Sequence, residues 1–155
     1  MARVLVVGCG CRGRELAGEL RSRGHAVRGT TRSESHLPEI LAADADAVVA
    51  DPNRLATLTP HLDGVTVLVW LMASAAGDGV EPLHGDRLTA LLETLVDTHV
   101  RGFVYEAAGS LDAALLDQGG ALVRQAGKTF HMPVEVVDSG AAVALADAVD
   151  RVLAA

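Results

Sequence analysis

Aromatic residues are almost missing from this sequence, which contains two Phe, one Trp and one Tyr among 155 residues. A core built around stacked rings is therefore excluded, and we expect the buried side chains to be mainly Val, Leu and Ala. Half of the residues are apolar and only 21% are charged, a composition that argues against an intrinsically disordered chain. The length fits one domain that is large enough to bury a core.

Lysine is also scarce, because Lys128 is the only one, and the formal net charge is −7. Nucleic-acid binding needs clustered Lys and Arg against the phosphates, so we expect no nucleic-acid partner. Arginine is nevertheless concentrated in the first third of the chain, which leaves room for a small phosphorylated ligand. Six Arg residues lie between positions 12 and 32: Arg12, Arg14, Arg21, Arg23, Arg28 and Arg32.

Cysteine occurs only as Cys9 and Cys11, a spacing that matches neither a zinc site nor a redox C-x-x-C pair. The six His residues are scattered without metal-ligand spacing, so we expect no metal. The first apolar run, 4–7, is too short for the core of a signal peptide, and no stretch is long enough to span a membrane. We therefore expect a reduced cytoplasmic protein without a membrane partner.

Strand and helix patterns alternate along the whole chain. Val-rich runs predict strands at 3–8, 26–30, 45–50, 65–71, 102–107 and 134–138. The segments between and after them predict helices at 11–23, 34–42, 84–99, 111–131 and 141–153, with a short helix or turn at 54–62. This alternation predicts an α/β fold in three layers, a doubly wound parallel sheet of about six strands in the order 3-2-1-4-5-6. We expect one such domain over 1–155.

Three of the predicted helices carry further expectations. The 84–99 helix has an apolar stripe that can cover the sheet or form a homodimer interface, but not both; it comprises Leu88, Leu91, Leu92, Leu95 and Val96. In the 111–131 helix, Gly119 and Gly120 are expected to weaken or break the helix. In the last helix, Asp147 and Asp150 are predicted to be solvated charges.

The chemistry is concentrated in residues 8–13, which read G-C-G-C-R-G and fit the pattern G-x-G-x-x-G. The pattern follows a predicted strand and opens a predicted helix, the context of a dinucleotide-binding turn. Gly8 would allow the tight turn, Gly10 would let a pyrophosphate approach the backbone, and Gly13 would let the helix pack on the strand. The amides of Cys11 and its neighbours would then face the phosphates. The helix N-terminus could also lower the pKa of a nearby thiol, although small side chains simply suit a tight loop.

The end of the second predicted strand indicates which dinucleotide is preferred. A site that prefers NAD usually has an acidic residue there for the ribose 2′-hydroxyl, whereas this chain has Thr30, Thr31 and Arg32. Hydroxyls and a guanidinium suit a 2′-phosphate, and Arg12 could approach the same group. We predict NADP as the cofactor, with NAD as the alternative.

The ends of the third and fourth predicted strands supply the remaining candidates. Asp51, followed by Pro52, could accept a hydrogen bond from the adenine amine, although Asp-Pro-Asn is also ordinary turn chemistry. Leu71, Met72 and Ala73 would face the ribose or nicotinamide, an assignment that rests on topology alone.

The opening VLVVGCGCRGRELAGELRSRGHAVRGTTRS is similar to that of atypical and extended short-chain dehydrogenases/reductases, especially epimerase/dehydratase-like and NmrA-like members. The resemblance implies a Rossmann fold that binds NAD(P). It is not complete, because reductases and epimerases of this group use a Tyr-x-x-x-Lys pair. The only Tyr here, Tyr105, lies inside a predicted strand with Gly109 four residues later, and Lys128 is too distant in sequence to complete the pair.

Two functions remain open at this point. A small oxidoreductase could pass hydride directly from the nicotinamide to a bound acceptor such as a flavin or quinone. A non-catalytic NADP(H)-binding sensor or regulatory module needs no catalytic pair, and the missing residues favour it. A scaffold that binds no nucleotide is disfavoured by the intact glycine pattern.

Overall fold

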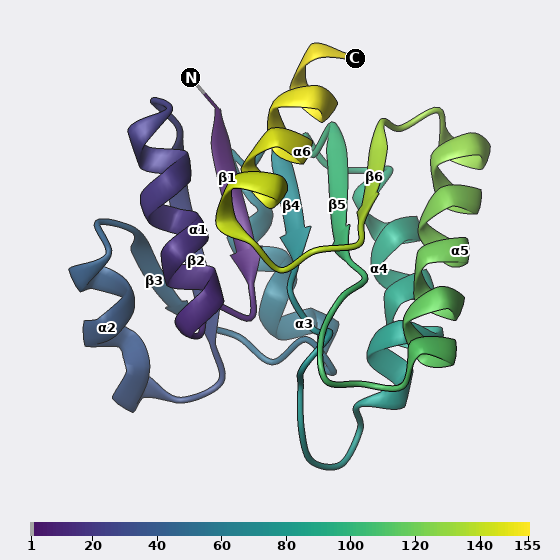
Figure 1. Cartoon of the computed structure of the whole chain (residues 1–155), viewed down its shortest axis with the longest axis horizontal. Helices are drawn as coiled ribbons and strands as arrows, with labels where there is room; N and C mark the ends of the chain where they lie inside the picture. Colours follow the sequence, from purple (N-terminus) through teal and green to yellow (C-terminus); the bar gives the residue numbers. More distant parts are fainter. Residues whose placement is uncertain (1) are drawn as a thin grey trace.

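Six parallel strands form a single sheet in the computed structural model, which describes residues 2–155 (Figure 1). The order is β3-β2-β1-β4-β5-β6, as predicted, and every neighbouring pair is parallel. The strands are β1 (Arg3–Val7), β2 (Ala26–Thr31), β3 (Asp46–Val49), β4 (Val67–Trp70), β5 (Gly102–Glu106) and β6 (Val134–Val137).

Helices cover both faces of this sheet, which gives the predicted three layers. One face is covered by α1 (Cys11–Ser22), α2 (Leu37–Ala42) and α6 (Ala142–Ala154). The other is covered by α3 (Leu55–Leu58), α4 (Asp86–Leu95) and α5 (Ala113–Phe130), together with short 3-10 turns at Thr59–Leu62 and Glu81–His84. A third 3-10 turn, Glu34–His36, leads into α2. No helix among residues 2–155 is both long and apolar enough to cross a membrane.

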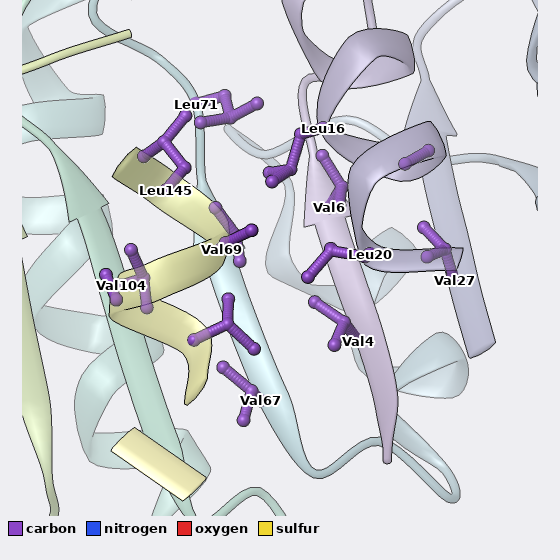
Figure 2. Packing of buried hydrophobic residues seen from close by; sticks show 14 of the residues in the cluster. Val4, Val6, Leu16, Leu20, Val27, Val67, Val69, Leu71, Val104 and Leu145 are labelled. Carbon is purple, nitrogen blue, oxygen red and sulfur yellow. The ribbon is translucent and has the colours of Figure 1, made fainter. Parts of the chain in front are cut away.

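The aliphatic core follows from the alternation of side chains along the central strands. Val4 and Val6 of β1 point toward α1 and α6, where they pack with Leu16 and Leu145 (Figure 2). The intervening residues of β1, such as Leu5, pack on the opposite face. Burial on both faces explains why β1, β4 and β5 have nearly continuous apolar sequences.

The apolar stripe of the 84–99 segment belongs to the core. Leu88, Leu91, Leu92 and Leu95 are buried against the sheet, and α4 ends at Leu95. The inclusion of Val96 in the stripe was wrong, because its side chain lies beyond the end of the helix and is 53% exposed. The stripe therefore covers the sheet and is not a free surface for a dimer.

The expected break in the 111–131 helix does not occur, since α5 runs unbroken through Gly119 and Gly120. Close packing requires a glycine at position 119 and leaves little room at position 120. A Cβ on Gly119 would stand 2.5 Å from Cζ of Tyr105 and closer still to its hydroxyl, and one on Gly120 would stand 3.1 Å from Val136. The helix approaches the sheet more closely than any side chain at Gly119 would permit.

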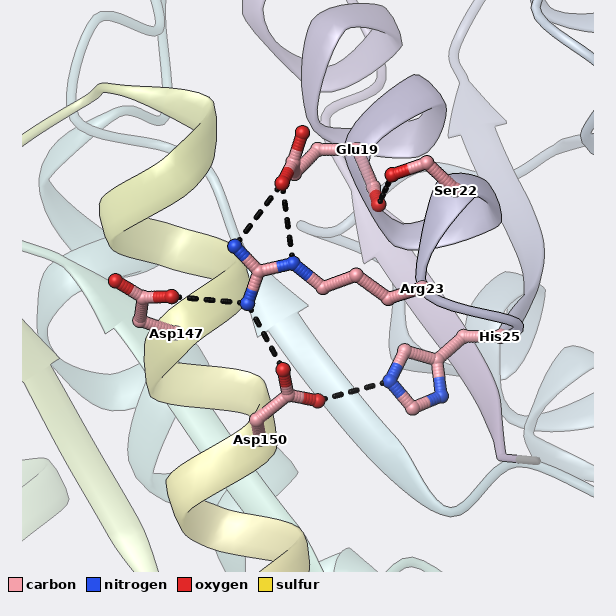
Figure 3. Close-up of polar contacts among 6 residues, drawn as sticks. All are labelled: Glu19, Ser22, Arg23, His25, Asp147 and Asp150. Atoms are coloured by element: carbon pink, nitrogen blue, oxygen red, sulfur yellow. Dashed lines mark hydrogen bonds and ion pairs between the residues drawn. The ribbon is translucent and has the colours of Figure 1, made fainter.

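Asp147 and Asp150 lie on the exposed side of α6, as predicted for solvated charges, and each also forms an ion pair that the sequence did not indicate (Figure 3). Arg23, which follows α1, donates to Asp147 at 2.9 Å and to Asp150 at 2.8 Å, and also to Glu19. His25 adds a bond to Asp150. This cluster joins α1 to α6 at the amino edge of the sheet, opposite the glycine loop.

Candidate functional site

The glycine loop connects β1 to α1, and its first and last glycines are needed for packing. Gly8 has a φ of +90°, and a Cβ there would stand 2.6 Å from the carbonyl oxygen of Leu71. A Cβ on Gly13 would stand 3.1 Å from the carbonyl oxygen of Gly8. Gly10 is different, because a Cβ there would meet nothing within 4 Å.

The space beside Gly10 is bordered by free hydrogen-bond donors. Gly10 is the N-cap of α1 and supplies no side chain to cap the helix. The amides of Cys11, Arg12 and Gly13 donate to no acceptor among residues 2–155, and the first bonded amide of the helix is that of Arg14. Three free amides at the positive end of a helix dipole, beside an open space, fit a phosphate group.

Thr30 fixes the glycine loop from β2. Its Oγ1 accepts a hydrogen bond from the amide of Gly8 at 3.2 Å, and its carbonyl accepts one from the amide of Cys9 at 2.9 Å. Because Thr30 is buried, its hydroxyl does not stand with Arg32 as a ligand for a 2′-phosphate. It contributes indirectly by holding the loop in place.

Cys9 packs under the loop against Gly29, where a Cβ would stand 2.6 Å from its Sγ. Burial raises the pKa of the Cys9 thiol to about 11, although the nearby Arg14 opposes this shift. The suggestion that the helix N-terminus activates this thiol was therefore wrong. Cys9 serves as a small apolar side chain that fills the space left by Gly29.

A cavity of about 490 Å³ lies at the carboxyl ends of β1 to β4, above the glycine loop. It brings together most of the predicted site residues: Gly8, Gly10, Cys11, Arg12, Gly13, Thr30, Thr31, Arg32, Pro52, Leu71 and Met72. Asn53 and Ser74, which continue the predicted strand-end segments, also line the cavity. Sequence reasoning did not assign several other lining residues, among them Arg14, His36, Glu39, Ala50, Asp78 and Leu83. The elongated set of strand ends suits a ligand that lies across the sheet edge.

Two predicted residues, Asp51 and Ala73, do not line the cavity. Oδ1 of Asp51 accepts a hydrogen bond from the amide of Asn53 at 2.9 Å, which is the turn chemistry offered as the alternative. Ala73 is fully buried, and its carbonyl accepts from the amide of Leu111 at 3.1 Å. Asn53 itself faces the cavity and donates to the carbonyl of Gly79, which ties the loop after β4 to the end of β3.

Positive charge gathers at the end of β2. Arg14 and Arg32 supply this charge, and His36 and one acid, Glu39, line the same part of the cavity. Glu39 pairs with Arg14 at 2.9 Å and approaches His36 at 3.6 Å. Arg32 is exposed and makes no ion pair among residues 2–155, so its guanidinium is available to an anionic ligand.

Arg12 points away from that group, contrary to the expectation that it joins Arg32. Its Nη1 donates to Oε2 of Glu106 at 2.6 Å and, more weakly, to the carbonyl of Ala108 at 3.4 Å. Glu106 is the last residue of β5 and is fully buried, and its Oε1 has no hydrogen-bond partner of ordinary geometry. Burial raises the pKa of this carboxyl, opposed by Arg12 and the amide of Ala73.

Tyr105 belongs to β5, and its side chain is fully buried on the face of the sheet that α4 and α5 cover. Its hydroxyl is hydrogen-bonded to His84, which is equally buried. Nε2 of His84 lies 3.0 Å from the carbonyl of Met72, which can only accept, so Nε2 carries the proton. Nδ1 is then the acceptor for the hydroxyl of Tyr105. Burial also raises the pKa of Tyr105, and the phenol is therefore unavailable to a ligand in the cavity.

We expect His84 to make the fold sensitive to mild acid. Burial lowers the pKa of its imidazole below the ordinary value, although the bond to Met72 opposes this. The unfolded chain then binds a proton that the folded chain excludes, so the free energy of unfolding should fall as pH decreases below about 6.5. Urea unfolding of the wild type and His84→Gln at pH 7.5 and 5.5 tests this. An equal loss in both proteins would contradict the role of His84.

Comparison with known proteins agrees with this geometry. No curated protein sequence matches the chain significantly. Among solved structures, one similar protein is assigned as an NAD-dependent epimerase/dehydratase from Bacillus halodurans, with a TM-score of 0.71 and 21% identity over 88% of this chain and 69% of that one. UDP-glucuronic acid 4-epimerase from Bacillus cereus, solved with NAD, has a TM-score of 0.64 and 17% identity over 86% and 55%. Vestitone reductase from alfalfa has a TM-score of 0.67 and 17% identity over 88% and 56%.

The TM-scores show a shared Rossmann-like fold. The chain spans only slightly more than half the length of the second and third proteins. The relatives agree with the resemblance to epimerases, dehydratases and reductases that the opening sequence indicates. A family model described as NAD(P)H-binding matches residues 8–130, which include the glycine loop and strands β2 to β5. The chain therefore belongs to this NAD(P)H-binding family.

Proposed function

We propose that this chain binds NADP(H) in preference to NAD(H), as a single domain over residues 1–155. The observation that carries the proposal is Arg32, an exposed guanidinium at the end of β2 that pairs with no acid in the described part of the chain and lines the same cavity as the glycine loop. Arg14 and Thr31 also line this cavity, and Glu39, the acid that lies with them among the described residues, is engaged by Arg14. A 2′-phosphate at this position would receive charge-assisted hydrogen bonds.

Arg32→Glu tests the preference. We expect the affinity for NADPH to fall by roughly 10- to 100-fold, because one charge-assisted hydrogen bond is lost and a carboxylate faces the phosphate. The affinity for NADH should change little. Calorimetric titration with both nucleotides measures this, and Arg101→Glu, the same charge change at the opposite edge of the sheet, is the control. Equal weakening of NADPH and NADH would argue against a 2′-phosphate site.

The position of Tyr105 favours a non-catalytic role over an oxidoreductase with a tyrosine proton donor. Its hydroxyl is bonded to His84 within the core and does not reach the cavity. If the chain transfers hydride, it must do so directly from the nicotinamide to an acceptor such as a flavin or quinone. The cofactor would supply the hydride, while the chain would bind and orient it.

Turnover separates the two roles. We expect the purified protein to oxidise NADPH no faster than buffer when flavins and quinones are offered as acceptors. Substantial turnover that disappears in a variant unable to bind the nucleotide would establish an oxidoreductase instead. The loss in that variant is essential, because a contaminating reductase would be unaffected by the substitution.

A further inference from the structure

We propose that Glu106 is a positioning residue that holds Arg12 against the nicotinamide-side phosphate of the dinucleotide. The inference rests on the proposed function, since it concerns the same ligand. It assigns roles to an ion pair that joins two distant parts of the chain, the first turn of α1 and the end of β5. Glu106 would not touch the ligand, whereas Arg12 would.

The location of Arg12 points to this phosphate. The cavity is lined by the ends of β1 to β4, and Arg12 reaches from the glycine loop toward the end of β5. A dinucleotide whose adenosine lies near Arg32 must cross the glycine loop before its nicotinamide reaches β4 and β5. Arg12 stands at the end of that crossing, on the side away from the adenosine.

The pairing leaves Arg12 able to bind a second anion. Only its Nη1 is used by Glu106 and Ala108, and 36% of the side chain remains exposed, so other N–H groups can face the cavity. Glu106, in contrast, is completely buried and has no other ion pair among the described residues. Removing Arg12 from a buried carboxylate is strongly unfavourable, so the guanidinium stays in place when the ligand arrives.

Fixing a guanidinium before binding reduces the rotamer entropy that binding must otherwise overcome. The same effect explains why Glu106 needs no contact with the ligand. Without the carboxylate, Arg12 would keep its charge and lose its orientation. The contribution of Arg12 to affinity should then fall, even though removing the carboxylate makes the net charge around Arg12 more positive.

Three ligands separate this role from a general structural one. NADPH and 2′-phospho-ADP-ribose contain both bridging phosphates, whereas adenosine 2′,5′-bisphosphate lacks the nicotinamide-side phosphate. In Arg12→Gln and Glu106→Gln we expect calorimetry to show roughly 10- to 100-fold weaker binding of the first two ligands. Binding of adenosine 2′,5′-bisphosphate should weaken by less than about threefold, since its phosphates contact other groups. Arg21→Gln, on the same helix and paired only with exposed Asp44, should bind all three like the wild type.

The double variant Arg12→Gln/Glu106→Gln keeps the test informative if a single variant folds poorly, because it leaves no unpaired buried charge. It should show the same selective loss as Arg12→Gln, since Glu106 acts only through Arg12. Equal weakening of all three ligands, or tighter NADPH binding by Glu106→Gln, would overturn the positioning role. If the wild type bound adenosine 2′,5′-bisphosphate and NADPH but Arg12→Gln left NADPH unchanged, only this inference would fail. Failure of the wild type to bind any of the three would instead overturn the proposed function as well.

Discussion

Gly10→Glu should abolish detectable NADPH binding while leaving the fold intact. The backbone of Gly10 has a φ of −82°, which any residue can adopt, and a Cβ there meets no atom within 4 Å. The new side chain would occupy the space that the free amides of the first turn border, and its charge would repel a phosphate. We expect an affinity loss of more than about 100-fold, from the loss of several hydrogen bonds to a charged group.

The measurement pairs a binding assay with a stability assay. Trp70 is the only Trp and lies buried at the end of β4, so energy transfer from it to NADPH reports binding, and thermal unfolding reports the fold. The control is Gly18→Glu, at an exposed glycine of the same helix with nothing within 4 Å. Unchanged NADPH binding by Gly10→Glu would show that the loop does not hold the phosphates.

The second large effect concerns stability, and it changes sign between two helical glycines. Gly119→Ala should lower the free energy of unfolding by about 2–3 kcal/mol, the cost of forcing extra volume into a packed core. The side chain that would have to move is Tyr105, which is rigid, buried and bonded to His84. Gly18→Ala should raise the same free energy by about 0.5–1 kcal/mol, because alanine favours the helix and meets only solvent.

Urea unfolding of both variants gives the two signs directly. In the Tyr105→Phe background, Gly119→Ala should lower the free energy of unfolding by less than it does in the wild type, because the hydroxyl nearest the new Cβ is gone. A stabilised Gly119→Ala protein would mean that the glycine pair is a tolerated weakness of the helix, as its sequence suggests. Gly119 would then carry no packing requirement.

The strand order and the glycine loop could be predicted because their signals are local. A Val-rich run such as 3–7 must be buried on both faces, and parallel strands with right-handed crossovers leave few possible orders. The roles of Gly8 and Gly13 likewise follow from a turn between one strand and the next helix. The end of β2 was also predictable, since Thr31 is the last residue of the strand and Arg32 follows it directly.

The rest depended on side chains that meet only after folding. Glu106 and Arg12 are separated by 94 residues, and His84 and Tyr105 by 21, so no spacing rule joins them. The glycines of α5 have a low helix propensity, and only the distance to Tyr105 shows why packing overrides it. Asp51 was ambiguous for a different reason, because the same carboxylate suits an adenine amine and a turn.

Because Cys9 contacts Gly29, the side chains at these two positions share one limited space. The glycine loop can stay close to β2 only while the sum of the two side chains is small, whichever position carries the larger one. A Cβ at position 29 would stand 2.8 Å from the Cβ of Cys9 and 3.0 Å from Ile40, so in related chains a larger residue at the position of Gly29 should occur only with Gly at that of Cys9. A thiol beside a nucleotide loop can thus be retained for its size, with its redox chemistry playing no part.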